Sequence, residues 1–317
     1  MTGFNLEPSA RELTEAIAQG PALSGVSLEQ ARQAVEAAQS APIPMPEVDE
    51  SWVTLPSAFG DFDVRVVRPA GSAGPLPAVL FLHGGGWILG SWITHDLLTR
   101  RLAVGANAAV VFAEYARAPE ARYPVQPEQG YAAARWITKQ GAGGGFDSTR
   151  IAVAGDSAGG NLATVLALMA KQRGDVQFVH QSLYYPMTDA DPADSESLRT
   201  FKDGPYGSAE GMAWFWNSYL APEQPRSDIL VSPLRATPAD LEGLPPALVI
   251  VDENDVLRDQ GEAYADKLRA AGVPTTSVRF NGTIHDFMRL NALRDSESTR
   301  AAITLATAAL RRAFGSE

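Results

Sequence analysis

The chain has 317 residues, enough for two domains or for one large α/β domain with an attached lobe. Hydrophobic residues make up 45% and charged residues 20%, so the sequence can form a sizeable core, which argues against extensive disorder. With 26 Lys and Arg against 37 Asp and Glu, the formal net charge is −11. This balance argues against a nucleic-acid partner, because phosphate binding needs clustered cations.

The sequence contains no cysteine, which excludes disulfides, thiol nucleophiles, iron–sulfur clusters and cysteine zinc sites together. The stretch from Met1 to Gly20 lacks a cationic start and an unbroken apolar run. It therefore predicts neither a signal peptide nor a membrane anchor. We expect a cytoplasmic protein with no membrane partner.

Near the amino terminus, apolar residues recur at helical spacing in residues 6–19 and 27–39, and Gly20-Pro21 separates the two segments. This spacing predicts two amphipathic helices. The stretch from Ala41 to Pro46 cannot continue a helix, because proline lacks the amide hydrogen and restricts the residue before it. We expect a stiff linker there.

Beyond this linker, short β-rich runs alternate with longer helical ones. The expected strands are residues 63–67, 78–82, 109–112, 151–154, 182–185, 247–251 and 276–280. The expected helices are residues 95–105, 127–140, 158–173, 259–271 and 298–314. Several strands are continuously apolar, as strands covered by helices on both faces are. The alternation predicts an α/β fold with a mostly parallel central sheet.

Residues 189–233 interrupt this alternation and are rich in Asp, Pro and aromatic residues. We expect this insertion and the segment 1–46 to form a helical cap over a core built from residues 47–188 and 234–317. The alternative is that the insertion is a surface excursion with a small core of its own.

The strongest signal for chemistry is Gly155-Asp156-Ser157-Ala158-Gly159, which lies between an apolar run and a helical segment. In this setting the pattern G-x-S-x-G is typical of a nucleophile elbow. Small residues must flank the serine in so tight a turn, and the free amides at the start of the next helix favour negative charge. Taken alone, the motif also fits a plain turn at a helix start.

A second motif, His83-Gly84-Gly85-Gly86-Trp87, directly follows the expected strand 78–82. Successive glycines let the backbone approach a substrate and point several amide hydrogens at one spot, which an oxyanion formed in acyl transfer requires. A flexible loop with an unrelated histidine is the alternative. The order of the two motifs matches the α/β-hydrolase pattern.

A serine needs a base that takes its proton and an acid that orients the base, and in this fold the chain order is serine, acid, histidine. Among the four histidines, His83 and His95 precede the serine motif. His180 lies just before an expected strand, where a structural role is expected. The remaining histidine, His285, follows the last expected strand and is the candidate base.

Four carboxylates follow the strand 247–251, and any of them could be the acid that orients the base. They are Asp252, Glu253, Asp255 and Asp259. Spacing favours Asp255, since 285 − 255 = 30 residues leave room for one helix and one strand before His285. Asp259 fits a helix start, where its charge suits the helix dipole.

Together, these motifs resemble the hormone-sensitive-lipase group of α/β hydrolases, also called bacterial esterase family IV. The resemblance runs from about residue 64 to the end of the chain. The run from Tyr115 to Glu120 is similar to the family's Tyr-Arg-Leu-Ala-Pro-Glu, and the run from Asp255 to Asp259 to its Asp-Pro-Leu-Arg-Asp. The sequence departs from the family at Ala116, at Val256 and at Asp286, which stands where a glycine usually follows the base.

The resemblance implies an α/β-hydrolase fold with a helical cap and a serine carboxylesterase activity that needs no metal or cofactor. It implies the catalytic residues Ser157, Asp255 and His285. It also implies an oxyanion hole made by the backbone amides of Gly85, Gly86 and Ala158, in a motif that includes His83 and Gly84. Relatives often dimerise through the last strand, here residues 276–280.

Aromatic residues in the segments expected near the site favour small, hydrophobic substrates, that is, short-to-medium acyl or aryl esters. The expected pocket residues are Trp87, Tyr206, Trp214, Phe215 and Phe287. Trp214 and Phe215 could instead hold the cap onto the core. An amidase or peptidase with the same serine chemistry and a non-catalytic small-molecule receptor stay open as alternatives, although His285 favours turnover.

Overall fold

The computed structural model describes residues 3–19, 26–192 and 195–316. Its strands are β1 (Val48–Leu55), β2 (Phe62–Pro69), β3 (Leu76–Leu82), β4 (Ala109–Glu114), β5 (Phe146–Asp156), β6 (His180–Tyr184), β7 (Ala247–Asn254) and β8 (Thr275–Ile284). They form one eight-stranded sheet in the order β1-β2-β4-β3-β5-β6-β7-β8. The pairs β1–β2 and β2–β4 are antiparallel, and the other neighbouring pairs are parallel. The mostly parallel α/β sheet predicted from the sequence is confirmed.

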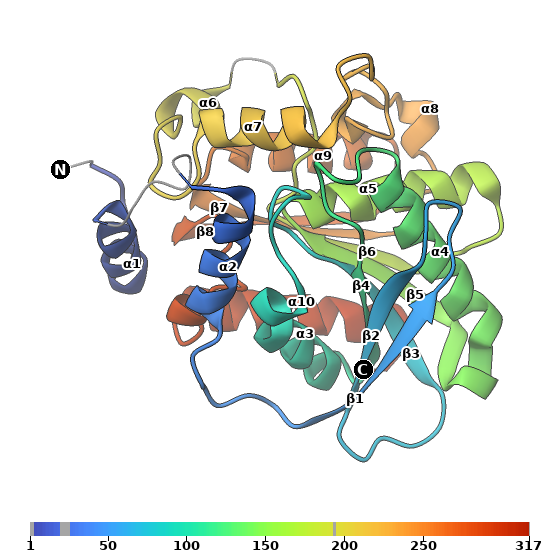
Figure 1. Ribbon diagram of the computed structural model, residues 1–317. Helices are drawn as coiled ribbons and strands as arrows, with labels where there is room; N and C mark the ends of the chain where they lie inside the picture. The colour runs from blue at the N-terminus through green and yellow to red at the C-terminus, as the bar shows by residue number, and fades with distance from the viewer. Residues whose placement is uncertain (1–2, 20–25, 193–194, 317) are drawn as a thin grey trace.

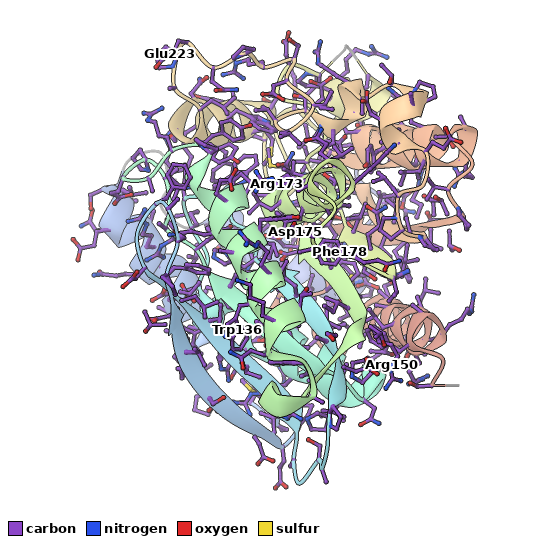
Figure 2. All side chains as sticks on the ribbon, turned by 90° about the vertical axis from the view of Figure 1, so that its right-hand side faces the viewer. Trp136, Arg150, Arg173, Asp175, Phe178 and Glu223 are labelled. Atoms are coloured by element: carbon purple, nitrogen blue, oxygen red, sulfur yellow. The ribbon has the colours of Figure 1, made fainter. Side chains whose placement is uncertain are left out.

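Helices cover both faces of the sheet (Figure 1). One face packs against α3 (Trp92–Ala106) and α10 (Glu297–Phe314), and the other against α4 (Val125–Gln140), α5 (Ala158–Arg173) and α9 (Arg258–Ala270). Each face has its own cluster of buried apolar side chains. Figure 2 shows the face covered by α4, where the ring of Trp136 packs edge-on against Phe146 with 5.3 Å between centroids. All seven residues of β3 are buried, which explains its unbroken apolar run.

The sequence patterns do not predict β1. Most residues of this strand are exposed, and it pairs with β2 at an edge of the sheet. A strand with so little burial has no apolar alternation to reveal it.

The remaining helices come from the amino-terminal segment and from the connections between strands. They are α1 (Pro8–Ala18), α2 (Leu28–Gln39), α6 (Glu196–Thr200), α7 (Ala209–Tyr219) and α8 (Pro238–Leu241), with 3-10 turns at Gly141–Gly144, Pro233–Arg235 and Asn291–Leu293. In Figure 1, α6 and α7 lie across the top of the molecule and α2 lies beside α3. The expected break at Gly20-Pro21 lies outside the described residues. No described helix is long and apolar enough to cross a lipid bilayer.

Polar contacts fasten α2 to the main body of the protein. The Arg32 guanidinium donates hydrogen bonds to the carbonyl oxygens of Ile88 and Ala118 at 2.9 Å each, and it pairs with Glu120. Each of these partners lies between β3 and α4. The amino-terminal segment is thereby held against the loops that follow β3 and β4.

The turn between β5 and α5 depends on glycines. Ser157 is the single residue between the strand and the helix, and its φ of 54° lies in the left-handed region. A Cβ on Gly155 would lie 2.2 Å from the carbonyl oxygen of Gly159, and a Cβ on Gly159 would lie 1.9 Å from that of Leu82. The turn can therefore pack against the end of β3 because both positions lack a side chain.

We expect Gly159→Ala to destabilise the fold, because the added methyl group meets a backbone carbonyl that cannot move without shifting β3. The free energy of unfolding should fall by about 1–3 kcal/mol, as is typical of overpacking, and urea titration followed by circular dichroism measures it. Gly143→Ala is the matched control, since its Cβ meets nothing within 4 Å. Equal effects of the two substitutions would contradict this account of the turn.

Candidate active site

Ser157 presents its hydroxyl at the carboxyl end of the sheet. Its backbone N–H donates to the carbonyl oxygen of Tyr184 at 2.8 Å, which fixes the turn against β6. The hydroxyl lies 2.9 Å from Nε2 of His285, at hydrogen-bond distance. A strained φ at a residue held in this way is a common feature of functional sites.

His285 and Asp255 complete a line of three groups. His285 directly follows β8, and its Nδ1–H donates to Oδ2 of Asp255 at 2.8 Å. Asp255 directly follows β7, and its Oδ1 accepts the N–H of Leu257 at 2.9 Å. The hydrogen bonds thus run from a hydroxyl through an imidazole to a carboxylate, the arrangement that activates a serine nucleophile.

The structure distinguishes the four carboxylates that the sequence offers as candidates for the acid. Asp259 lies in the first turn of α9, where it accepts the N–H of Ser197 at 2.8 Å. Glu253 accepts the N–H of Gly282 at 2.7 Å. Asp252 lies closer to the base, with Oδ2 at 3.9 Å from Nδ1 of His285. Among the four, Asp255 makes the short contact to the imidazole.

The other three histidines have different partners. Nδ1 of His83 lies 2.8 Å from the carbonyl oxygen of Gly84, and burial lowers the pKa of His83 well below its usual range. Nε2 of His95 lies 3.1 Å from Asp156. His180 is buried on β6, and this burial lowers its pKa to about 4. None of these contacts includes the hydroxyl of Ser157.

Asp156, which stands beside Ser157 in the serine motif, contacts the glycine loop. Its Oδ1 accepts the N–H of Gly84 at 2.9 Å, and its carboxylate also faces His95. A Cβ on Gly84 would lie 2.4 Å from Oδ2 of Asp156. Asp156 therefore fastens the glycine loop to the serine turn, a contact between segments 72 residues apart that no local pattern signals.

Asp286, the residue at which the sequence departs from the family, lies beside the base. Its Oδ1 is 3.7 Å from Nε2 of His285, and its other oxygen pairs with Arg289. Arg289 is buried and lines the cavity, although it belongs to none of the sequence motifs. The only available signal was the spacing of opposite charges at positions i and i+3.

A cavity of about 240 Å³ opens onto Ser157 and His285. Gly85 and Gly86 of the glycine loop line it, as do Tyr206 and Phe215 from the region between β6 and β7. Helices α1, α2 and α7 contribute the apolar side chains of Ile17, Val35 and Met212. The cavity is mainly apolar, with Asp286 and Arg289 as its charged groups.

Three residues expected at the pocket do not line this cavity. Trp87 is fully buried and stacks on Tyr219 with 4.1 Å between ring centroids. Trp214 is 44% exposed on the outer side of α7, since adjacent residues of a helix point about 100° apart. Phe287 is fully buried and packs against Phe280 at 5.5 Å. In each case the sequence placed the residue close to the site but could not set the direction of its side chain.

Opposing effects set the basicity of His285. Burial lowers its pKa, whereas the carboxylates of Asp255 and Asp286 raise it, and the result is a pKa of about 9. Arg289 opposes the two carboxylates and lowers the pKa. The imidazolium form is therefore stabilised, which suits a base that must hold a proton during the reaction.

The oxygen and nitrogen atoms of Asp252, Asp255 and His285 lie within 4.8 Å of one another. Such a cluster has the residue types of a metal site. However, the two ring nitrogens of His285 are already engaged, one with Asp255 and the other with Ser157. The hydrogen bonds therefore favour acid–base chemistry at these residues over metal binding.

A hydroxyl, an imidazole and a carboxylate at the ends of parallel strands define a serine hydrolase of the α/β type. Residues 79–289 match a family model described as alpha/beta hydrolase fold, and the chain belongs to this family. It is 41% identical over 233 residues to carboxylesterase NlhH of Mycobacterium tuberculosis, covering 72% of each protein. It is 38% identical over 233 residues to an ethyl acetate hydrolase of Pseudomonas putida, covering 73% of this chain and 72% of the relative.

Solved structures of esterases also superpose on this chain. A thermostable esterase from Pseudomonas putida ECU1011 superposes with a TM-score of 0.94 at 41% identity, over 97% of each chain. A hyperthermophilic esterase from the archaeon Pyrobaculum calidifontis superposes with a TM-score of 0.89 at 37% identity, over 98% of this chain and 99% of that one. The protein is a serine carboxylesterase, which hydrolyses carboxylic esters.

We expect Asp286→Asn to move the acidic limb of the kcat/KM profile to lower pH. The substitution removes a carboxylate that lies 3.7 Å from His285 and that pairs with Arg289. The loss of this carboxylate, which leaves the charge of Arg289 less compensated, lowers the pKa of His285. Because an imidazole can accept a proton only in its neutral form, a lower pKa of His285 should let activity persist at lower pH. Values of kcat/KM for an aryl acetate, measured across a range of pH, locate this acidic limb.

The matched control for charge is Glu297→Gln, at an 89% exposed side chain in the first turn of α10. It removes one negative charge from the surface and should leave the limb in place. An acidic limb that stays in place or moves to higher pH in Asp286→Asn would show that Asp286 does not stabilise the imidazolium.

Proposed function

We propose that Ser157 is the nucleophile, His285 the general base and Asp255 the acid of an esterase of the hormone-sensitive-lipase group. The observation that carries this proposal is the unbroken hydrogen-bond path, 2.9 Å from Ser157 to His285 and 2.8 Å from His285 to Asp255. A non-catalytic receptor has no need for such a path.

The chemistry follows from this geometry. His285 takes the proton of Ser157 as the hydroxyl oxygen attacks the ester carbonyl, and Asp255 stabilises the imidazolium. The imidazolium then gives its proton to the departing alcohol, which leaves an acyl group on Ser157. A water molecule, deprotonated by the same base, attacks the acyl-enzyme. The carboxylic acid departs and the hydroxyl of Ser157 regains its proton.

The backbone amides of Gly85, Gly86 and Ala158 are the proposed oxyanion hole. Gly85 and Gly86 line the cavity beside Ser157, with φ of 98° and 63°, and Ala158 begins α5. These left-handed conformations let the loop turn tightly, and the start of a helix offers free N–H groups. Loss of one such donor typically costs about 3 kcal/mol of transition-state stabilisation.

The segment 1–46 and the insertion 189–233 are the proposed cap over the core residues 47–188 and 234–317. Support comes from the cavity, whose apolar wall includes side chains of α1, α2 and α7. A wall of this kind suits the acyl or aryl part of a small ester. We therefore propose short-to-medium acyl or aryl esters as substrates, in preference to peptides or other amides.

Two further expectations remain predictions. One is a cytoplasmic location. The other is a homodimer formed through the last strand, which is supported by the position of β8 at an edge of the sheet. An edge strand has backbone groups on its outer side that can pair with a second copy.

We expect Ser157→Ala to lower kcat for p-nitrophenyl acetate by roughly 10⁶-fold, the loss typical when a serine nucleophile is removed. Circular dichroism and thermal unfolding show whether the variant keeps its fold. Hydrolysis by the folded variant at rates close to wild type would mean that another group is the nucleophile. A parallel panel of anilides tests the class, since faster cleavage of anilides than of esters would indicate an amidase.

We expect Phe215→Ala to shift the preferred acyl chain toward longer esters, because the Phe215 ring packs on Gly86 and fills part of the cavity. Its neighbour Trp214 does not line the cavity and is 44% exposed, although its ring packs beside that of Phe215 with 5.1 Å between centroids, so Trp214→Ala is the control for loss of an aromatic side chain from α7. The kcat/KM values for acetate through decanoate esters measure the preference. The same shift in both variants would show that cap stability, and not the cavity wall, sets chain length.

A further inference from the structure

Asp252 lies on β7, three residues before Asp255, and no step of the mechanism above uses it. Its side chain is fully buried, and neither carboxyl oxygen has a hydrogen-bond partner among the described residues. Buried polar groups nearly always have a partner, and an isolated buried carboxylate is costly. The state of this side chain therefore requires an explanation.

Asp252 faces the same ring nitrogen as Asp255. Its Oδ2 lies 3.9 Å from Nδ1 of His285, which donates its hydrogen bond to Asp255 at 2.8 Å. The oxygen atoms of the two carboxyl groups and the ring nitrogen all lie within 4.8 Å of one another. Two carboxyl groups and one imidazole thus form a single buried cluster.

The neighbouring charges do not neutralise Asp252. From the segment after β8, Arg289 pairs with Asp286 and lies 3.9 Å from Asp156. From the segment after β6, Tyr185 packs edge-on against the ring of His285 at 5.0 Å, and its hydroxyl has no partner among the described residues. The nearest positive charge available to Asp252 is therefore that of His285 in its imidazolium form.

The two carboxyl groups differ in the donors that they receive. Asp255 accepts hydrogen bonds from the N–H of Leu257 and from His285, and both stabilise a carboxylate. Asp252 receives neither. Burial raises the pKa of Asp252 well above its usual range, and the negative charges of Asp255 and Asp286 raise it further. Two adjacent buried carboxyl groups with one set of donors share a single charge at neutral pH.

We propose that Asp252 is a positioning residue of the triad formed by Ser157, His285 and Asp255. Asp252 keeps its proton and donates it in a hydrogen bond to Asp255. The pair then carries one negative charge, held next to His285. This inference rests on the roles proposed above for Ser157, Asp255 and His285. It satisfies the otherwise unpaired side chain of Asp252, and an oxygen of Asp255 that already accepts one hydrogen bond can accept a second.

The first consequence concerns basicity. A proton shared with Asp255 draws negative charge away from the imidazole, so Asp252 lowers the pKa of His285. An ionised Asp252 would add a negative charge near His285 and raise that pKa. Removal of the side chain therefore moves the acidic limb of kcat/KM in opposite directions under the two protonation states.

The second consequence concerns redundancy. In Asp255→Asn the like charge next to Asp252 is lost, so Asp252 can release its proton to solvent and ionise. Its carboxylate then lies close enough to Nδ1 of His285 to orient the ring after a shift of about 1 Å from its 3.9 Å position. Asp252 would thus replace the missing acid in part.

The test is a kcat/KM pH profile for Asp252→Ala and Asp252→Asn with an aryl acetate. We expect an upward shift of the acidic limb by about half a pH unit or more in Asp252→Ala. Asp252→Asn keeps a neutral donor to Asp255 and should shift the limb less. A downward shift in both variants would show that Asp252 is ionised and would overturn the proposal.

A double-mutant cycle tests whether Asp252 can replace Asp255. Removal of the acid of a triad typically lowers kcat by roughly 10⁴-fold. We expect Asp255→Asn to lose only about 10²-fold, and the Asp252→Asn/Asp255→Asn double variant to lose roughly 10⁴-fold. Equal kcat in the single Asp255→Asn variant and the double variant would contradict the redundancy. Thermal unfolding checks that each isosteric variant is folded.

The same measurements separate this inference from the proposed function. Wild-type kcat in both Asp255→Asn and the double variant would show that neither carboxyl group supports the base, and the assignment of Asp255 would fail. A roughly 10⁴-fold loss in Asp255→Asn, with no further loss in the double variant, would keep that assignment and reject only the role of Asp252.

Discussion

The hydrogen bond between Ser157 and His285 depends on a close approach of backbones that only glycine permits. The two residues are 128 positions apart and meet because β5 and β8 are parallel strands whose carboxyl ends share one edge of the sheet. The serine reaches that edge on a turn in which Gly159 touches the end of β3. Asp156, inside the same turn, holds the glycine loop in place. The serine turn and the glycine loop are thus positioned by one packed contact, and not independently of each other.

Around the imidazole of His285, the protein has buried three carboxyl groups, more than one imidazole needs as partners. Asp255, Asp252 and Asp286 all face His285, whereas Arg289 pairs with Asp286. Carboxylates this close cannot all ionise in a buried site without a large penalty. The number of charges on the cluster, and not only its geometry, therefore decides how readily the base gives up its proton.

The sequence predicts the parts of this protein that local chemistry controls. The parallel core strands show as apolar runs, and the serine turn and glycine loop show as glycine patterns, because their backbones allow few alternatives. The strand β1 is not predicted because it is mostly exposed. The orientations of the side chains of Trp87, Trp214 and Phe287 are not predicted either, because helix phase and tertiary packing determine them. The contacts of Asp156 with Gly84 and with Arg289 join distant segments, so no spacing in the sequence reveals them.

The reacting groups and the cavity wall come from different parts of the chain, and this separation has a physical basis. Ser157 follows the buried end of β5, and His285 follows the last three residues of β8, which are also buried. Much of the wall comes from helices outside the sheet, which are fastened by polar contacts such as those of Arg32. A substitution on α7 changes the space available to a substrate without disturbing a strand. The geometry of ester cleavage can therefore stay constant while the esters that fit the cavity change.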